Sequence, residues 1–151
     1  MAAEQVQGAD RRARSREKLF TLVETRTETL SLYASLAACQ PFTADPAVAE
    51  SVQQFCQALV DYAASAHFQL YRYIADNKER RRAVVEVAEK LYPQIARTTD
   101  AFLEFNDRYD VAHFQERVDG LAEDLSRLGE LLADRIQWED EVIQAFGGLR
   151  P

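Results

Sequence analysis

The chain has 151 residues, of which 47% are hydrophobic and 28% charged, with only five Gly and four Pro. A chain of this length and composition is expected to fold as one compact domain rather than stay disordered, and it lacks the run of ~20 apolar residues that a membrane-spanning helix requires. The net charge of −7 is uneven, because residues 99–146 hold 13 acidic against 4 basic residues whereas residues 1–98 hold 12 against 13. This distribution disfavours direct binding of nucleic acid and favours a basic protein partner, with an ordinary solvated surface as the alternative.

The N-terminal segment and the two cysteines bear on the cellular compartment of the protein. Residues 1–18 are polar and lack the apolar region of a secretion signal. Cys39 and Cys56 do not have the spacing of a metal site. We therefore expect a cytoplasmic protein without membrane association, in which both thiols are small buried groups and a disulfide between them is the less favoured alternative.

The first half of the chain contains two predicted helices. The first covers residues 10–38, and its proposed inner stripe is Leu19, Val23, Leu30, Tyr33 and Ala37, with Arg26 on the same stripe. Its basic, weakly apolar front end makes residues 1–15 the candidate flexible segment. The second helix begins where Asp45 can cap it and Pro46 can occupy its first position. Its apolar positions then alternate in steps of about four and three: Val48, Val52, Phe55, Leu59, Tyr62, Ala66, Leu70 and Tyr73.

Two more predicted helices follow. The third covers residues 79–105 through Val84, Val87, Leu91, Ile95, Thr98, Phe102 and Phe105, and Pro93 predicts a kink or break near Tyr92. The fourth begins after Asp110, ends at Gly147-Gly148, and carries Phe114, Val118, Leu121, Leu125, Leu128, Leu132, Ile136, Val142 and Phe146. Four long amphipathic helices with short connections predict an all-α, up-and-down four-helix bundle that forms one domain over residues 1–151.

Polar residues on the helices are the candidates for chemistry. The sequence contains no Gly-rich phosphate loop, no nucleophile elbow and no His-Glu-x-x-His motif. Arg135 and Glu139 are four residues apart on or near an apolar stripe, which predicts a structural polar pair, because a buried charge needs a partner. A di-metal bundle site needs about six ligands, but neither His67 nor His113 follows a Glu by three residues. We therefore expect no metal, no cofactor and no enzymatic activity.

A recognition surface is the remaining possibility. Phe68 and Tyr71 adjoin His67 off the main seam of the second predicted helix, and Asp61 lies nearly two turns earlier. Large aromatic side chains and carboxylates of this kind anchor helical or basic partners. Ordinary packing against a neighbouring helix explains the same spacing equally well, so both readings stay open.

The same residues resemble a known family. The segment 55–62, FCQALVDY, followed by Ala66-His67-Phe68 and Tyr71, is similar to the bacterial Rsd/AlgQ family of regulators of the primary sigma factor. Weaker agreement spans residues 18–146: Lys18, Leu19, Arg26, Leu30 and Leu36, then Tyr92-Pro93-Gln94, then Gly129, Leu132, Arg135 and Glu139-Asp140. Two features depart from the family, because residues 20–23 replace its usual Arg-Trp pair and the connection at residues 76–83 is short and basic.

The resemblance implies a function. Members of the family are cytoplasmic helical bundles that act as anti-sigma factors: they bind the C-terminal region of the housekeeping sigma factor and block its contacts with the promoter −35 element and with core RNA polymerase. Asp61 matches a position implicated in sigma binding, and His67, Phe68 and Tyr71 follow as further partner-binding candidates. Two alternatives are a metal-containing bundle enzyme using His67, Glu139 and Asp140, and a helical adaptor with a changed protein partner.

Overall fold

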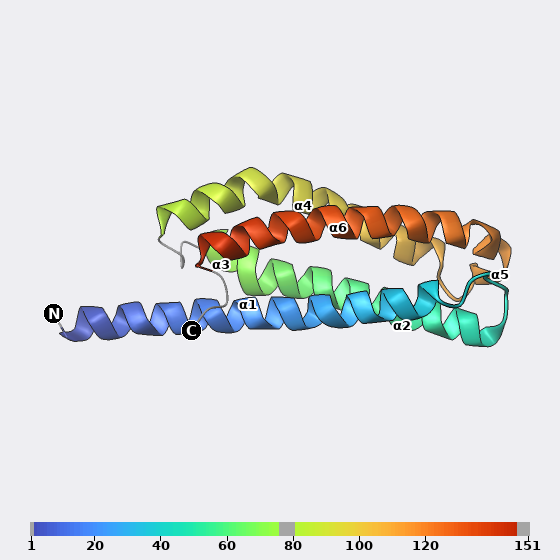
Figure 1. The fold of residues 1–151 in the computed structure, drawn as a ribbon, viewed down its shortest axis with the longest axis horizontal. Helices are drawn as coiled ribbons and strands as arrows, with labels where there is room; N and C mark the ends of the chain where they lie inside the picture. The colour runs from blue at the N-terminus through green and yellow to red at the C-terminus, as the bar shows by residue number, and fades with distance from the viewer. Residues whose placement is uncertain (1, 76–80, 148–151) are drawn as a thin grey trace.

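The computed structural model describes residues 2–75 and 81–147. Its long helices are α1 (Ala2–Ala37), α2 (Pro46–Ala66), α4 (Arg82–Arg108) and α6 (Leu121–Ala145). Short elements follow α2 and precede α6: a π-helical turn η1 (His67–Tyr71), α3 (Arg72–Ala75), α5 (Phe114–Arg117) and a 3₁₀ turn η2 (Val118–Gly120). Successive long helices run in opposite directions (Figure 1), which confirms the predicted all-α bundle. Most of the basic connection at residues 76–83 lies outside the described residues.

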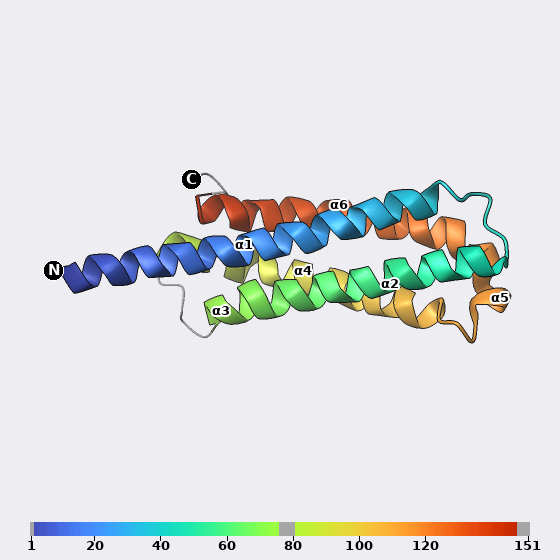
Figure 2. The same ribbon diagram turned by 90° about the horizontal axis from the view of Figure 1, so that it is seen from below.

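The four long helices form a closed arrangement in which each one has two neighbours. α1 packs along α2 and α4 packs along α6, while contacts between α2 and α4 and between α1 and α6 complete the bundle. The two views agree on this order, and both show the N-terminal part of α1 extending past the ends of the other helices (Figures 1 and 2). None of the described helices is long and apolar enough to cross a membrane.

The start of α2 follows the predicted chemistry. The Asp45 side chain accepts a hydrogen bond from the backbone N–H of Ala47 at 2.9 Å, and Pro46 occupies the first turn, where its missing N–H costs no helical bond. From there the residues at positions 52, 55, 59, 62, 66 and 70 are buried, as the spacing predicted. The side chain of Tyr73, the last member of that predicted seam, lies outside the described side chains.

The buried stripe of α1 differs from the predicted one. Leu22, Thr29 and Leu36 are buried, whereas Leu30 is 38% exposed, so the predicted placement of Leu30 in the core is wrong. The true seam steps from residue 19 through 22, 26, 29 and 33 to 36, and two of its members are polar. Thr29 can occupy the seam because its hydroxyl donates to the carbonyls of Thr25 at 2.8 Å and Ala58 at 3.2 Å.

The third predicted helix is confirmed with a bend, and the fourth needs correction. α4 continues through Pro93 as one helix that bends along its course (Figure 1), because buried Leu91 and Ile95 hold both sides of the missing hydrogen bond against the core. The fourth predicted helix is divided into α5, η2 and α6. It ends as predicted: Gly147 adopts a φ of 93°, the left-handed conformation that glycine tolerates without strain.

The two cysteines lie in different environments. Cys56 is buried, as predicted, whereas Cys39 is exposed just beyond the end of α1, which corrects the prediction for that thiol. Position 39 follows the last helical turn, so no second helix covers it. Both thiols are free.

Candidate partner-binding site

An exposed stripe runs along α2 into the π-helical turn. Gln57, Asp61, Ala64 and Phe68 follow each other at steps of four, three and four residues, which places them on one helical face, and all four are exposed. We call these residues the α2 stripe. Asp61 accepts a hydrogen bond from Gln57 Nε2 at 3.0 Å, and the Phe68 side chain is 57% exposed. The stripe therefore presents a carboxylate and a large aromatic ring to any partner.

The π-helical turn η1 explains why this end of the helix is unusual. The backbone N–H of Arg72 donates to the carbonyl of His67, five residues earlier, so the turn contains one extra residue. Within this turn Leu70 and Tyr71 are both buried, while His67 and Phe68 are exposed. Such turns occur frequently at functional sites. Three of the four predicted partner-binding residues lie within this one turn.

A groove separates η1 and α3 from α4. It has a volume of about 620 Å³, and its residues are His67, Tyr71, Arg72, Ile74, Val85, Ala88, Glu89, Tyr92 and Pro93. His67 Nδ1 and Tyr92 Oη lie 3.4 Å apart, and the rings of Tyr71 and Tyr92 have centroids separated by 5.1 Å. Tyr71 is only 6% exposed. It therefore lies beneath the surface and can contact only a group that enters the groove.

A buried polar network joins the four long helices behind this groove. Glu139 of α6 accepts hydrogen bonds from Tyr62 Oη of α2 and from Arg135 Nε at 3.0 Å. Arg135 Nη1 donates to the hydroxyls of Thr98 and Thr99 of α4, at 3.1 and 2.8 Å. The side chains of Arg135 and Glu139 are 1% and 0% exposed, so the ion pair that the sequence suggested lies in the core.

Two further contacts complete this network. Arg26 of α1 lies 3.6 Å from Glu139 and 2.9 Å from Asp140, which balances the two arginines with two carboxylates. The guanidinium of Arg135 also lies over the rings of Tyr62 and Phe102, 4.9 and 5.2 Å from their centroids.

Burial and neighbouring charge determine the protonation of the network. Burial by itself would lower the pKa of Arg135, but the charge and hydrogen bond of Glu139, together with Tyr62 and Tyr71, outweigh burial and the pKa is raised. Burial and the charge of Glu139 both raise the pKa of Tyr62, which therefore stays a neutral hydrogen-bond donor. Burial likewise raises the pKa of Tyr71. These groups keep one charge state across the physiological pH range, which suits a structural role.

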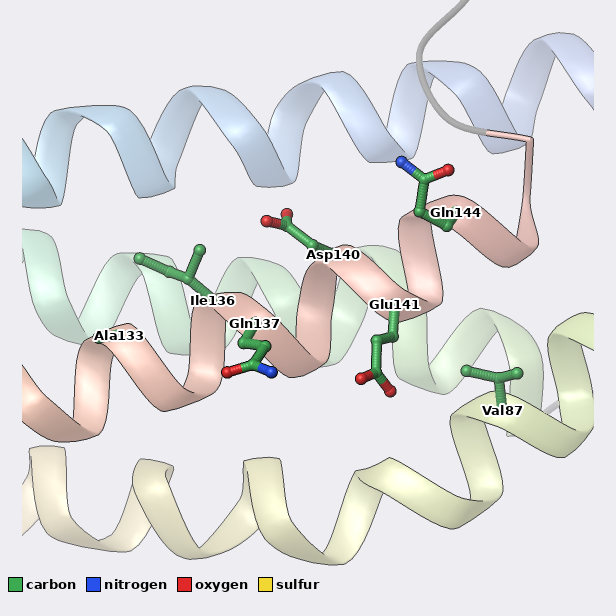
Figure 3. Close-up of a pocket in the computed structure, with 7 residues that line it drawn as sticks. All are labelled: Val87, Ala133, Ile136, Gln137, Asp140, Glu141 and Gln144. Atoms are coloured by element: carbon green, nitrogen blue, oxygen red, sulfur yellow. The ribbon is translucent and has the colours of Figure 1, made fainter.

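The outer face of α6 carries part of the predicted acidic surface. A shallow depression of about 590 Å³ lies along it, and Figure 3 shows Ile136, Asp140 and Gln144 directed toward α1 while Gln137 and Glu141 are directed toward α4. Ile136, predicted as a core position, is only partly buried here. The depression is lined by carboxylates, amides and aliphatic side chains.

The candidate metal ligands have other partners. Glu139 is bound to Arg135 and Tyr62, Asp140 to Arg26, and His67 adjoins Tyr92. Within residues 2–75 and 81–147, no group of three His, Cys, Asp or Glu side chains is placed to hold a metal ion.

Comparison with known proteins identifies the family. A profile described as "Regulator of RNA polymerase sigma(70) subunit, Rsd/AlgQ" matches residues 1–146. The chain belongs to the Rsd/AlgQ family. It is 28% identical over 134 residues to a protein named "Regulator of sigma D" from Yersinia pseudotuberculosis serotype O:1b (strain IP 31758), which covers 86% of this chain and 79% of that protein. The "Regulator of sigma D" of Enterobacter sp. (strain 638) is 34% identical over 95 residues, or 62% of this chain and 57% of that one. No solved structure shows a significant match.

The Rsd/AlgQ match covers all the features described above. The α2 stripe, the groove and the buried network all lie within residues 1–146. Sequence reasoning singled out Asp61, His67, Phe68 and Tyr71 but missed the groove wall formed by Tyr92. The aromatic-Pro-Gln motif at residues 92–94 was the available signal, because it places a large ring directly before the proline of this helix.

Proposed function

We propose that this Rsd/AlgQ protein is a non-enzymatic anti-sigma factor that binds the C-terminal region of the housekeeping sigma factor. Binding would block the contacts of that region with the promoter −35 element and with core RNA polymerase. The contact surface would be the α2 stripe with His67 beside it, and Tyr71 would support it from below. The observation that carries the proposal is the presence of Asp61 and Phe68 on one exposed helical face at a π-helical turn.

Charge and shape support this partner. The sigma region that the family resemblance implies contains a basic helix-turn-helix, and an acidic bundle would attract it by long-range electrostatics. Asp61 is exposed and accepts a surface hydrogen bond from Gln57, which leaves carboxylate lone pairs for a cation. Phe68 adds an exposed apolar ring of the kind that dominates binding energy at interfaces.

A pull-down with the isolated C-terminal domain of the primary sigma factor tests the proposal. We expect the wild-type protein to bind, and Asp61→Ala to reduce affinity roughly tenfold or more, because an interfacial cation would lose its partner. Asp134→Ala is the matched control, since Asp134 is an exposed aspartate of a different helix. It removes the same charge without touching the α2 stripe.

The outcomes separate the hypotheses. Failure of the wild-type protein to bind sigma would refute the anti-sigma function, and unbiased co-purification from the native host would then identify the partner of a helical adaptor. If Asp61→Ala and Asp134→Ala weakened binding equally, the effect would come from the net charge of the protein and not from a contact of Asp61. Undiminished binding by Asp61→Ala would remove that residue from the interface.

A further inference from the structure

A small polar pit adjoins the groove described above. It has a volume of about 220 Å³ and shares His67, Tyr71 and Tyr92 with the groove, while Thr99, Asp100 and Arg135 bring polar groups from the other side. The groove itself is lined mainly by rings and aliphatic side chains. Together the two cavities form one site with a polar end and an apolar end, within the size range of small-molecule sites, about 300–1,000 Å³.

One hydroxyl in the pit lacks a hydrogen-bond partner. Tyr71 Oη is buried and has no hydrogen-bond partner among the described residues. Buried hydroxyls are nearly always paired, so an unpaired one at a cavity wall indicates a missing acceptor. Arg135 also lines the pit, and its hydrogen bonds to described residues leave from Nε and Nη1. Its guanidinium is therefore a second group that such an acceptor would meet.

The charges around the pit restrict the ligand further. Arg135 is neutralised by Glu139, and Asp100 adds a negative charge at the pit wall. A ligand whose only charge is a carboxylate would be repelled by the carboxylate of Asp100. A ligand whose only charge is an ammonium group would leave Tyr71 Oη without an acceptor. A head group with both charges satisfies both sides.

We propose that the groove and pit bind a free α-amino acid with a large apolar side chain. Its carboxylate would accept hydrogen bonds from Tyr71 Oη and Arg135, and its ammonium group would pair with Asp100. The side chain would lie in the groove against Tyr92 and Pro93. This inference concerns the isolated protein and does not depend on the identity of the protein partner.

Titration of the ¹⁵N-labelled full chain with three probes tests the proposal by NMR. L-Phenylalanine carries both charges, 3-phenylpropanoate lacks the ammonium group and phenethylamine lacks the carboxylate. We expect L-phenylalanine to shift the amide signals of residues lining the pit and groove, and each analogue to bind about tenfold more weakly. Absence of binding by L-phenylalanine, or equal binding of all three probes, would overturn the proposal.

Two variants assign the contacts. Tyr71→Phe removes only an unpaired hydroxyl, so it should fold normally and bind L-phenylalanine roughly tenfold more weakly. Tyr33→Phe is the matched control, because its hydroxyl donates to the Leu125 carbonyl at 2.9 Å, outside the site. Asp100→Asn should weaken L-phenylalanine but not 3-phenylpropanoate. Unchanged affinity in Tyr71→Phe, or equal loss in both tyrosine variants, would refute the assigned geometry.

Discussion

The buried ion pair permits a quantitative test of how the bundle is held together. Glu139→Gln preserves the size of the side chain but removes its charge. Arg135 would then remain as a buried cation, 1% exposed, whose neighbouring hydrogen-bond acceptors among the described residues are all uncharged. Breaking one side of a buried pair typically costs about 3–5 kcal/mol. The Gln amide oxygen can still accept one hydrogen bond, so we expect a loss near the lower end, about 3 kcal/mol.

Arg135→Met should be milder. After that change Glu139 keeps the hydrogen bond from Tyr62 and the charge of Arg26 at 3.6 Å. The double variant Arg135→Met/Glu139→Gln contains no uncompensated charge at this position, so its loss should be smaller than the sum of the two single losses by about 2 kcal/mol.

Urea denaturation followed by circular dichroism at 222 nm measures these values. Domains of this size have an unfolding free energy of about 5–15 kcal/mol, so a loss of about 3 kcal/mol is readily resolved. If the unfolding free energy falls by about 2 kcal/mol per molar urea, this loss lowers the urea midpoint by about 1.5 M. A Glu139→Gln variant within 1 kcal/mol of wild type would refute the reasoning. Strict additivity in the double variant would show that the two residues do not interact energetically.

Three further predictions concern single positions. A methyl group at Gly129 would lie 2.9 Å from Tyr33 Cζ, so Gly129→Ala should lower the unfolding free energy in urea by about 1–3 kcal/mol despite the better helix propensity of Ala. Burial raises the pKa of Cys56 to about 12, so a thiol reagent such as DTNB should react quickly with Cys39 alone in the native protein. Phe68→Ala should leave the free energy of unfolding within about 0.5 kcal/mol of wild type. The same variant should bind the sigma C-terminal domain about 30-fold more weakly, a loss of about 2 kcal/mol.

Each of these predictions has a clear contrary result. A more stable Gly129→Ala variant would mean that the Tyr33 ring moves aside without loss of packing. If both thiols reacted quickly with DTNB in the native protein, Cys56 would have to lie at the surface. If Cys56 is buried, unfolding in guanidinium should make one additional thiol per chain reactive. A large loss of stability in Phe68→Ala would assign that ring to the core instead of the interface.

Much of the fold could be predicted from local sequence signals. The start of α2 was predictable because Asp45 and Pro46 act on the backbone at their own positions, and its seam was predictable because its members are apolar. The seam of α1 was predicted only in part, because polar Thr29 occupies a core position and apolar Leu30 lies one residue away from it. Only contacts with other helices make a polar residue acceptable there, and such contacts leave no local pattern.

The site shows the same division. The Arg135–Glu139 pair was predictable, because opposite charges four residues apart on an apolar stripe can pair, and a buried charge without a partner is costly. Their partners on α2 and α4 were not, since no spacing links Tyr62 or Thr98 to α6. The π-helical turn also escaped prediction, because a shift of one backbone hydrogen bond leaves no mark in the apolar periodicity.

The polar network and the exposed site are mechanically linked through Arg135. An apolar core of the same volume would often be as stable as a buried ion pair, so stability alone does not explain why charges lie here. Hydrogen bonds, unlike apolar contacts, fix the direction of the guanidinium, and Arg135 lines the pit below His67 and Tyr71. The network thus fixes one wall of the pit that His67 and Tyr71 of η1 also line. Substituting Arg135 should therefore alter the groove even where the fold survives, and NMR shifts in residues 67–72 of Arg135→Met would reveal it.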